Sequence, residues 1–373
     1  MNAKILIILI VLIGLGAGGF FVWKNLFLPE AEKEKIEEEE EITGEQVSEE
    51  RVVLSGEEGE EEEEEAVPEK EVSEEEEKKP APTPTQITFL ENLAADPSWS
   101  PDGSKIVFLS LEKDQMKGGL YMINSDGTGL TSIGPWERDH LFNPSWSPVG
   151  NKVVAYGERE NTGLFLVDLD EDWTKRVQLT TQKVEHASWS PDGNKIAYNV
   201  YNEDKSFSSI WVMNADGSGK IQLTTDEDDF CTGPSFSYDG SKIVYLKGFT
   251  TTMPGEKPKE AINEIWVMNN DGSNKHIIYA PGDGMQLIRE RAWNKNNKII
   301  FAKHQYQRAP QIWIINSDGA SPQCILDPEE GGIPTAIYDD AVWDNSGTKV
   351  AVTKVILTVA GEPWQVATFP WEE

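Results

Sequence analysis

Seven polar residues stand just ahead of recurring aromatic motifs, and they are this chain's candidates for binding chemistry. Two of them, Arg289 and Arg291, flank a glutamate and form a basic pair in an otherwise acidic or neutral set. Guanidinium groups hold carboxylates through charge-assisted hydrogen bonds, so this pair could bind a carboxylate-bearing peptide or sugar. The alternative is that these charges pair with Asp339, Asp340 and one another. The seven candidate ligand- or partner-binding residues are Asp96, Asn143, His186, Thr232, Arg289, Arg291 and Asp340.

Catalytic chemistry finds less support in the sequence. His140 and His186 precede adjacent motif copies and, with Asp340, could line a metal site, but two histidines at unmatched offsets do not make a ligand pattern. The chain also has no Gly-x-Ser-x-Gly segment of the kind that presents a nucleophilic serine. We therefore expect no catalytic residue, no bound metal, no cofactor and no enzymatic activity.

The elements that position these residues are six copies of one short motif. Its clearest copies read Ser-Trp-Ser-Pro-Asp-Gly, beginning at Ser98 and Ser188, and each continues two residues later into Lys-Ile. One turn that recurs in every copy along the chain is typical of stacked-repeat proteins. In the third unit the aromatic and β-branched runs predict strands over 186–190, 195–200, 210–214 and 221–224. The aromatic anchors of the six units are Trp99, Trp146, Trp189, Phe236, Trp293 and Trp343.

The turns themselves have a specific chemistry. Proline presets φ for the first turn position, aspartate tolerates the next, and glycine takes the positive φ that closes a short hairpin loop. A second Asp-Gly turn recurs later in most units, for example at Asp216-Gly217. Calcium binding by these aspartates is an alternative, but each turn supplies too few carboxylates and lacks the spacing of a calcium loop. We interpret the turns as structural.

The middle strands predict how the units pack. Segments such as 105–109 and 264–268 are apolar at nearly every position, which indicates strands covered on both faces. Four-stranded sheets stacked around an axis satisfy that pattern, so residues 86–373 are predicted to form an all-β, six-bladed β-propeller with the aromatic anchors between blades. The sixth unit has three strands, and residues 86–90 are expected to supply its fourth and close the ring.

The repeat has a recognisable relative. Trp-Ser-Pro-Asp-Gly-x-Lys-Ile, then Ile-Trp-Val-Met-Asn-x-Asp-Gly-Ser and Gln-Leu-Thr, resembles the WD-like repeat of the TolB-like propellers, and the resemblance covers residues 86–373. It implies a six-bladed propeller outside the cytoplasm that binds proteins or cell-envelope components.

The charge is concentrated in one tract. The net charge is −32, and residues 30–79 alone hold 25 glutamates against six lysines and arginines. Residues 30–85 have no aromatics and end in a proline-rich run, so they are expected to be a disordered, extended linker. Binding of a cation or a basic partner by the glutamates is the alternative. The chain has no basic stripe, which argues against nucleic acid as a partner.

The amino-terminal segment predicts a membrane anchor. Residues 5–23 carry no charge, lie between Lys4 and Lys24, and nearly span a bilayer core of about 30 Å. We predict a transmembrane signal-anchor over residues 1–29, with a signal peptide cleaved near Ala17 as the alternative. The expected protein is a single-pass membrane protein that holds an extracytoplasmic propeller, which binds or scaffolds an envelope or extracellular protein or peptide. The alternatives are a carbohydrate- or metal-dependent enzyme with its site in the channel, and a spacer without a ligand.

Overall fold

The computed structural model describes most of the region after residue 82, and all of its regular structure is strand. The predicted anchor and nearly all of the predicted linker lie outside the described residues. Within the described residues, no helix is long and apolar enough to cross a membrane. The described ranges are 83–111, 118–136, 141–157, 162–171, 175–202, 207–225, 230–248, 263–280, 285–287, 292–305, 308–329, 336–356 and 364–371.

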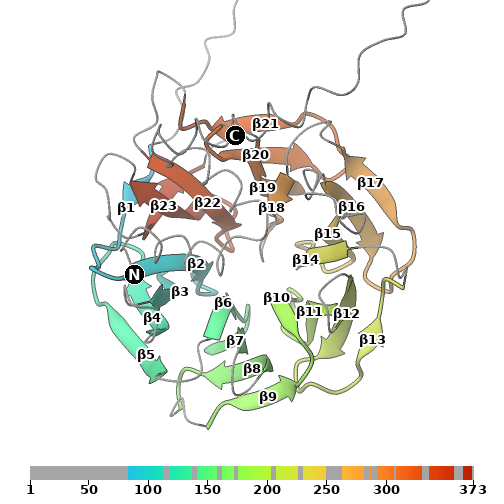
Figure 1. The fold of residues 1–373 in the computed structure, drawn as a ribbon, viewed down its shortest axis with the longest axis horizontal. Helices are drawn as coiled ribbons and strands as arrows, with labels where there is room; N and C mark the ends of the chain where they lie inside the picture. The colour runs from blue at the N-terminus through green and yellow to red at the C-terminus, as the bar shows by residue number, and fades with distance from the viewer. Residues whose placement is uncertain are drawn as a thin grey trace, which may run out of the picture. The chain divides into compact units, whose positions relative to one another are not determined.

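The described strands form antiparallel units of four, and Figure 1 shows these units side by side in a ring. The first two units contain β2 (Leu93–Trp99), β3 (Lys105–Leu111), β4 (Gly118–Asn124), β5 (Thr131–Trp136), β6 (Leu141–Trp146), β7 (Lys152–Gly157), β8 (Gly163–Asp168) and β9 (Val177–Thr180). The next two contain β10 (Val184–Trp189), β11 (Lys195–Tyr201), β12 (Ser208–Asn214), β13 (Ile221–Gln222), β14 (Phe230–Phe236), β15 (Lys242–Gly248), β16 (Asn263–Asn269) and β17 (His276–Tyr279). The remaining strands are β18 (Met285–Leu287), β19 (Lys298–His304), β20 (Gln311–Asn316), β21 (Gln323–Leu326), β22 (Ala336–Trp343), β23 (Lys349–Ile356), β24 (Gln365–Pro370) and β1 (Thr85–Gln86).

This arrangement is an all-β propeller fold. Within each unit the strands pair from an inner strand near the axis to a fourth strand at the rim, in sequence order except in the last unit, where β1 is the rim strand (Figure 1). The third and fourth units join into one eight-stranded sheet through a single parallel pair, Ser208 with Phe230. Elsewhere the units remain separate sheets, so side-chain packing holds them together.

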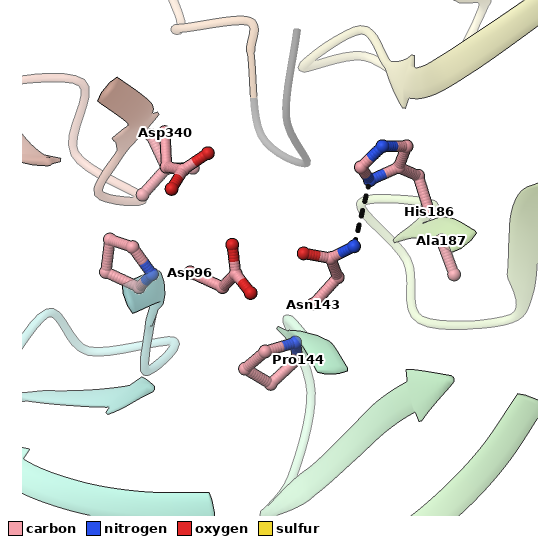
Figure 2. Close-up of a pocket in the computed structure, with 8 residues that line it drawn as sticks. Asp96, Asn143, Pro144, His186, Ala187 and Asp340 are labelled. Atoms are coloured by element: carbon pink, nitrogen blue, oxygen red, sulfur yellow. Dashed lines mark hydrogen bonds between the residues drawn. The ribbon is translucent and has the colours of Figure 1, made fainter. Parts of the chain in front are cut away.

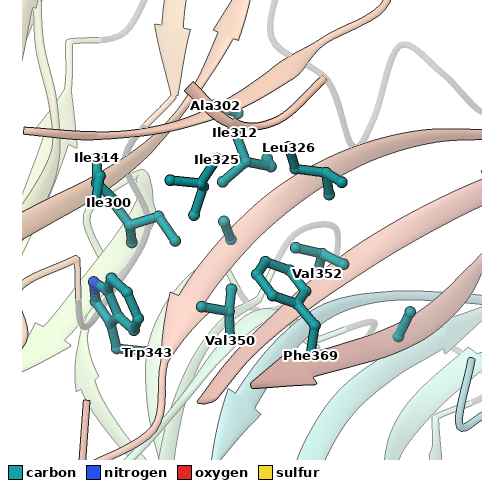
Figure 3. Packing of buried hydrophobic residues seen from close by; sticks show 12 residues of the cluster. Ile300, Ala302, Ile312, Ile314, Ile325, Leu326, Trp343, Val350, Val352 and Phe369 are labelled. Atoms are coloured by element: carbon teal, nitrogen blue, oxygen red, sulfur yellow. The ribbon is translucent and has the colours of Figure 1, made fainter. Parts of the chain in front are cut away.

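That packing places the aromatic anchors between units, as the sequence predicted. Trp343 of β22 lies in a cluster with Ile300 and Ile312 of the preceding unit (Figure 3). Trp99 likewise lies in a cluster with residues of β22, β23 and β24. Trp189 adds a hydrogen bond from its indole nitrogen to the carbonyl of Ser145 in the neighbouring unit, at 3.0 Å. The recurring tryptophan is therefore a packing residue rather than a ligand-binding one.

The ring is closed by strand β1 against the last strand of the chain. Thr85 and Gln86 pair with Thr368 and Ala367 of β24. The regular strand is shorter than the predicted 86–90, because the Thr88 hydroxyl accepts the Val366 N–H at 2.8 Å in place of a ladder carbonyl. The third unit ends the same way. There the strand expected over 221–224 stops at Gln222, and the Thr224 hydroxyl accepts the Ile210 N–H at 2.9 Å.

The hairpin turns hold their aspartates ionised. Ser100 donates its hydroxyl to Asp102 at 2.7 Å, and the Ser104 backbone N–H donates to the same oxygen at 3.0 Å. These hydrogen bonds lower the pKa of Asp102 from 3.8 to about 2. The Ser190 and Ser237 hydroxyls lower the pKa values of Asp192 and Asp239 in the same way. Gly103 completes the first turn with a φ of +68°.

These turns predict a loss of stability in acid. A carboxyl group whose pKa is depressed by folding contributes stability above its unfolded pKa and loses it as the pH falls through the folded value. We expect the melting temperature to fall between pH values of about 4 and about 2. Asp102→Asn should reduce this dependence, measured by thermal unfolding at a series of pH values. The control is Asp318→Asn, at a turn where the Asp318 carboxylate accepts the Ala320 N–H. Equal pH profiles for the two variants would contradict the prediction.

Candidate functional site

The inner strands share an irregularity that shapes the centre of the ring. In β2, β6, β10, β14 and β22 the pairing with the second strand shifts two to four residues before the aromatic anchor. In four of these strands the residue three before the anchor has a positive φ: 53° at Asp96, 45° at Asn143, 60° at Gly233 and 52° at Asp340. Aspartate, asparagine and glycine are the residues that adopt this conformation most readily. Such bulges re-aim side chains.

The re-aimed side chains line one pocket. Asp340, Asp96, Asn143 and His186 come from four consecutive units and surround a small pocket that is partly open to solvent (Figure 2). Asp96 and Asp340 are buried, with 9% and 3% of their surfaces exposed. The structure thus brings together four of the seven residues that the sequence singled out. The remaining lining residues are Pro97, Pro144, Ala187 and Val342.

Hydrogen bonds orient the polar groups of this pocket. The Asn143 amide nitrogen donates to the Glu185 carbonyl at 2.9 Å and lies 3.4 Å from Nδ1 of His186. The His186 backbone N–H donates to the Asn199 side chain at 2.8 Å. Asp340 accepts the Thr353 hydroxyl at 2.8 Å. These contacts hold the side chains that face the pocket in defined orientations before any ligand arrives.

The other three predicted residues are placed differently. Thr232 of β14 pairs with Leu246 of β15 and stands one residue before Gly233. The position equivalent to Asp96 is Gly233, so it carries no side chain in that unit. Arg289 and Arg291 lie outside the described residues, and so does His140. The described residues contain no group of three His, Cys, Asp or Glu side chains that could hold a metal ion.

Sequence reasoning missed two polar contacts made by residues that precede pocket residues in the chain. His304 of β19 is buried, and its Nε2 lies 3.4 Å from Oδ2 of Asp339. The other oxygen of Asp339 accepts the Asp340 backbone N–H at 2.8 Å, which helps to hold the bulge. In the third unit the Tyr201 hydroxyl donates to Glu185, and burial, reinforced by the Glu185 charge, raises the pKa of Tyr201. The only signal in the sequence was position, since Asp339 and Glu185 each precede a pocket residue.

Comparison with known proteins agrees with this geometry. The family model described as the TolB beta propeller domain matches residues 82–326. The chain belongs to the TolB beta-propeller family. Two TolB structures resemble it, both at identities that establish the fold alone. The putative TolB of Agrobacterium tumefaciens is 18% identical with a TM-score of 0.52, and the alignment covers 77% of this chain and 93% of that one. TolB of Acinetobacter baumannii is 17% identical with a TM-score of 0.51, over 66% and 57%.

A curated relative carries a different description. The uncharacterized peptidase YuxL of Bacillus subtilis (strain 168) is 26% identical over 181 residues, which are 48% of this chain and 25% of YuxL. The match therefore covers only a quarter of YuxL, and the description as a peptidase applies to the whole of YuxL.

Proposed function

We propose that this protein is a membrane-tethered binding module whose six-bladed TolB-like propeller engages an envelope or extracellular protein or peptide. The observation that carries the proposal is the convergence of Asp96, Asn143, His186 and Asp340 from four units on one pocket at the ring's centre. Function commonly resides where a rigid scaffold presents polar side chains at loop and strand ends. TolB-like propellers bind proteins and peptides in general, which favours a macromolecular partner.

The tether forms the second part of the proposal. Residues 1–29 would anchor the chain in the membrane, and residues 30–85 would hold the propeller away from it on the extracytoplasmic side. The uncharged run between Lys4 and Lys24 supports the anchor, and glutamate repulsion in the following tract supports an extended linker. Arg289 and Arg291 remain predicted carboxylate-binding residues.

An enzyme acting at the channel is the second candidate. His186, which lines the same pocket as Asp96 and Asp340, favours it, because an imidazole and carboxylates in one site can transfer protons. A carbohydrate- or metal-dependent reaction would use these groups. Substitution of His186 by glutamine separates the two proposals, since it would abolish proton transfer while preserving a hydrogen-bonding side chain.

Capture of partners from envelope fractions tests the binding module. The full-length chain, chemically cross-linked in intact cells and purified, should recover its partner at least about tenfold better than Asp96→Asn/Asp340→Asn, because charge-assisted contacts are lost. Asn143 occupies the equivalent position at a φ of 45°, so the scaffold accepts asparagine there. Asp318→Asn is the matched control. Equal recovery by all three proteins would overturn the pocket's role, and protection of residues 30–85 from external protease would overturn the tether.

A further inference from the structure

Polar side chains end the apolar seam between the fifth and sixth units. Ala302 of β19 and Val352 of β23 belong to the buried cluster that fills this seam (Figure 3). Because side chains on one face of a strand recur every second residue, His304 continues the row of Ala302, and Lys354 continues the row of Val352. Both strands start at the hairpin turns, so His304 and Lys354 come to the end of the seam farthest from those turns.

Tyr338 of β22 joins them at that end. It stands directly opposite Lys354 in the pairing of β22 with β23, and it packs against the same apolar cluster. Residues in this relation have Cβ atoms about 4.5–5.5 Å apart, so a single ligand can meet both polar ends. Nε2 of His304 lies 3.4 Å from Oδ2 of Asp339, the next residue after Tyr338. The strand pairing and this contact therefore gather three polar side chains in one place.

These side chains are withdrawn from solvent without being satisfied. His304 is 5% exposed, and neither ring nitrogen has a hydrogen-bond partner among the described residues. Within the same part of the chain, Tyr338 and Lys354 make no hydrogen bond or ion pair. Burial lowers the pKa of Lys354 and raises the pKa of Tyr338. An anion placed beside Lys354 would offset the loss of hydration of its charge.

The repeat shows how a lysine at this position is otherwise accommodated. The fourth and fifth units carry an equivalent lysine, and in both a tryptophan of the third strand lies beneath its ammonium group. The pairs are Lys247 over Trp266, at 4.8 Å from the ring centre, and Lys303 over Trp313, at 5.4 Å. In the sixth unit the equivalent of these tryptophans is Ala367, which pairs with Val352. Lys354 therefore lacks the cation–π contact of its counterparts.

The composition of the propeller sharpens this contrast. Residues 86–373 carry 40 acidic against 25 basic side chains, so carboxylates are abundant near most lysines. Gln365, which stands opposite Lys354 in β24, is already engaged, because its amide accepts the Leu90 N–H at 3.1 Å and donates to the Leu90 carbonyl at 3.0 Å. The half-buried charge of Lys354 is thus left for a group from outside the chain.

We propose that His304, Tyr338 and Lys354 bind a carboxylate of the partner, namely an aspartate or glutamate side chain of a peptide segment, an inference that rests on the proposed binding function. The Lys354 ammonium group supplies the opposite charge, and the Tyr338 hydroxyl donates a hydrogen bond. An imidazolium has a donor on each nitrogen, so His304 can donate to Asp339 through Nε2 and to the ligand through Nδ1.

Other ligands fit this site less well. A cation would meet the Lys354 ammonium group without a carboxylate to hold it. A phosphate brings a larger negative charge toward Asp339, whose carboxylate already lies beside His304, and like charges at short range repel. The singly charged, planar carboxylate matches the three donors with the least repulsion.

Peptide titration tests the site directly. The probe is acetyl-Gly-Glu-Gly-amide, titrated into the full-length protein by calorimetry up to about 10 mM, the range in which one charge-assisted contact is measurable. The same peptide with glutamine in place of glutamate is the control, because it keeps the size and loses the charge. We expect this change and Lys354→Gln each to weaken binding about tenfold or more, and Tyr338→Phe about threefold. Lys247→Gln, at the equivalent position over Trp266, should leave binding unchanged.

Four results would overturn the assignment. They are no binding of the glutamate peptide, equal binding of the glutamine peptide, a loss for Lys247→Gln as large as for Lys354→Gln, and tighter binding of galacturonate than of the peptide, which would indicate an acidic sugar instead. The melting temperature is a second measurement. Lys354→Gln should melt no lower than the wild type, because it removes a desolvated charge. A lower value would show that Lys354 already has a stabilising partner, and it too would overturn the assignment.

Capture of the partner from cells separates this inference from the proposed function. If capture depends on Asp96 and Asp340 but not on Lys354, the binding module stands and the carboxylate site fails. If the glutamate peptide binds as expected and capture is equal for the wild type and all variants, the carboxylate site stands and the proposed function fails.

Discussion

Replacing Trp343 by alanine is expected to lower the free energy of unfolding by about 3–5 kcal/mol, the range for truncating a large aromatic residue in a packed core. Trp343 is fully buried and lies in one apolar cluster with Ile300 and Ile312 of the preceding unit and with Val350 and Phe369 of its own (Figure 3). The cavity would open between two units that share no described backbone ladder, so neither sheet can easily close it. Urea denaturation measures the loss.

Trp343→Phe is the matched control. The chain itself places phenylalanine at the equivalent position of the fourth unit, where Phe236 is buried. The indole nitrogen of Trp343 has no hydrogen-bond partner among the described residues, so its removal costs no hydrogen bond there. We expect phenylalanine to cost less than half as much as alanine. Equal losses for the two variants would show that Trp343 does not hold the units together through its bulk.

The parts of the fold that could be predicted from sequence are those fixed by local chemistry. Each Pro-Asp-Gly turn has its own donors and acceptors, and the middle strands are apolar at most positions because both of their faces are covered. Because the units repeat, equivalent positions lie at the same end of each inner strand. For this reason Asp96, Asn143, His186 and Asp340 could be grouped around the axis without knowledge of any contact between them.

What sequence could not supply depends on register and on long-range contact. The bulge in β14 interrupts the alternation of side chains, so Thr232 was assigned to the pocket although Gly233 occupies the position equivalent to Asp96. The contact of His304 with Asp339 joins two units and follows no repeated spacing. Strands β1 and β13 end where the hydroxyl of Thr88 or Thr224, in place of a backbone carbonyl, accepts the N–H of the neighbouring strand. Strand propensity does not predict this exchange of acceptors.

The second large effect is expected at Gly163, the first residue of β8. Its φ is +140°, and a Cβ added there would overlap the carbonyl oxygen of Thr180 and lie 2.9 Å from the carbonyl carbon. Thr180 belongs to the adjacent strand β9 and pairs with Leu164 of β8. The obstacle is therefore a backbone carbonyl, which cannot rotate away. Relief of the overlap requires separation of β9 from β8. Gly163→Ala should therefore destabilise the protein by more than about 4 kcal/mol, in the range reserved for severe local disruption.

Gly150→Ala separates this steric effect from the conformational one. Gly150 also has a positive φ, +73°, but a Cβ there would meet nothing within 4 Å. Its replacement should cost about 1–2 kcal/mol, the penalty for placing an L-residue in the left-handed region. Urea midpoints of the two variants, measured side by side, give the difference that belongs to the contact with Thr180. If the two alanines cost the same, the close approach of β8 and β9 at Gly163 is wrong, and the ladder of the second unit must begin at a different residue.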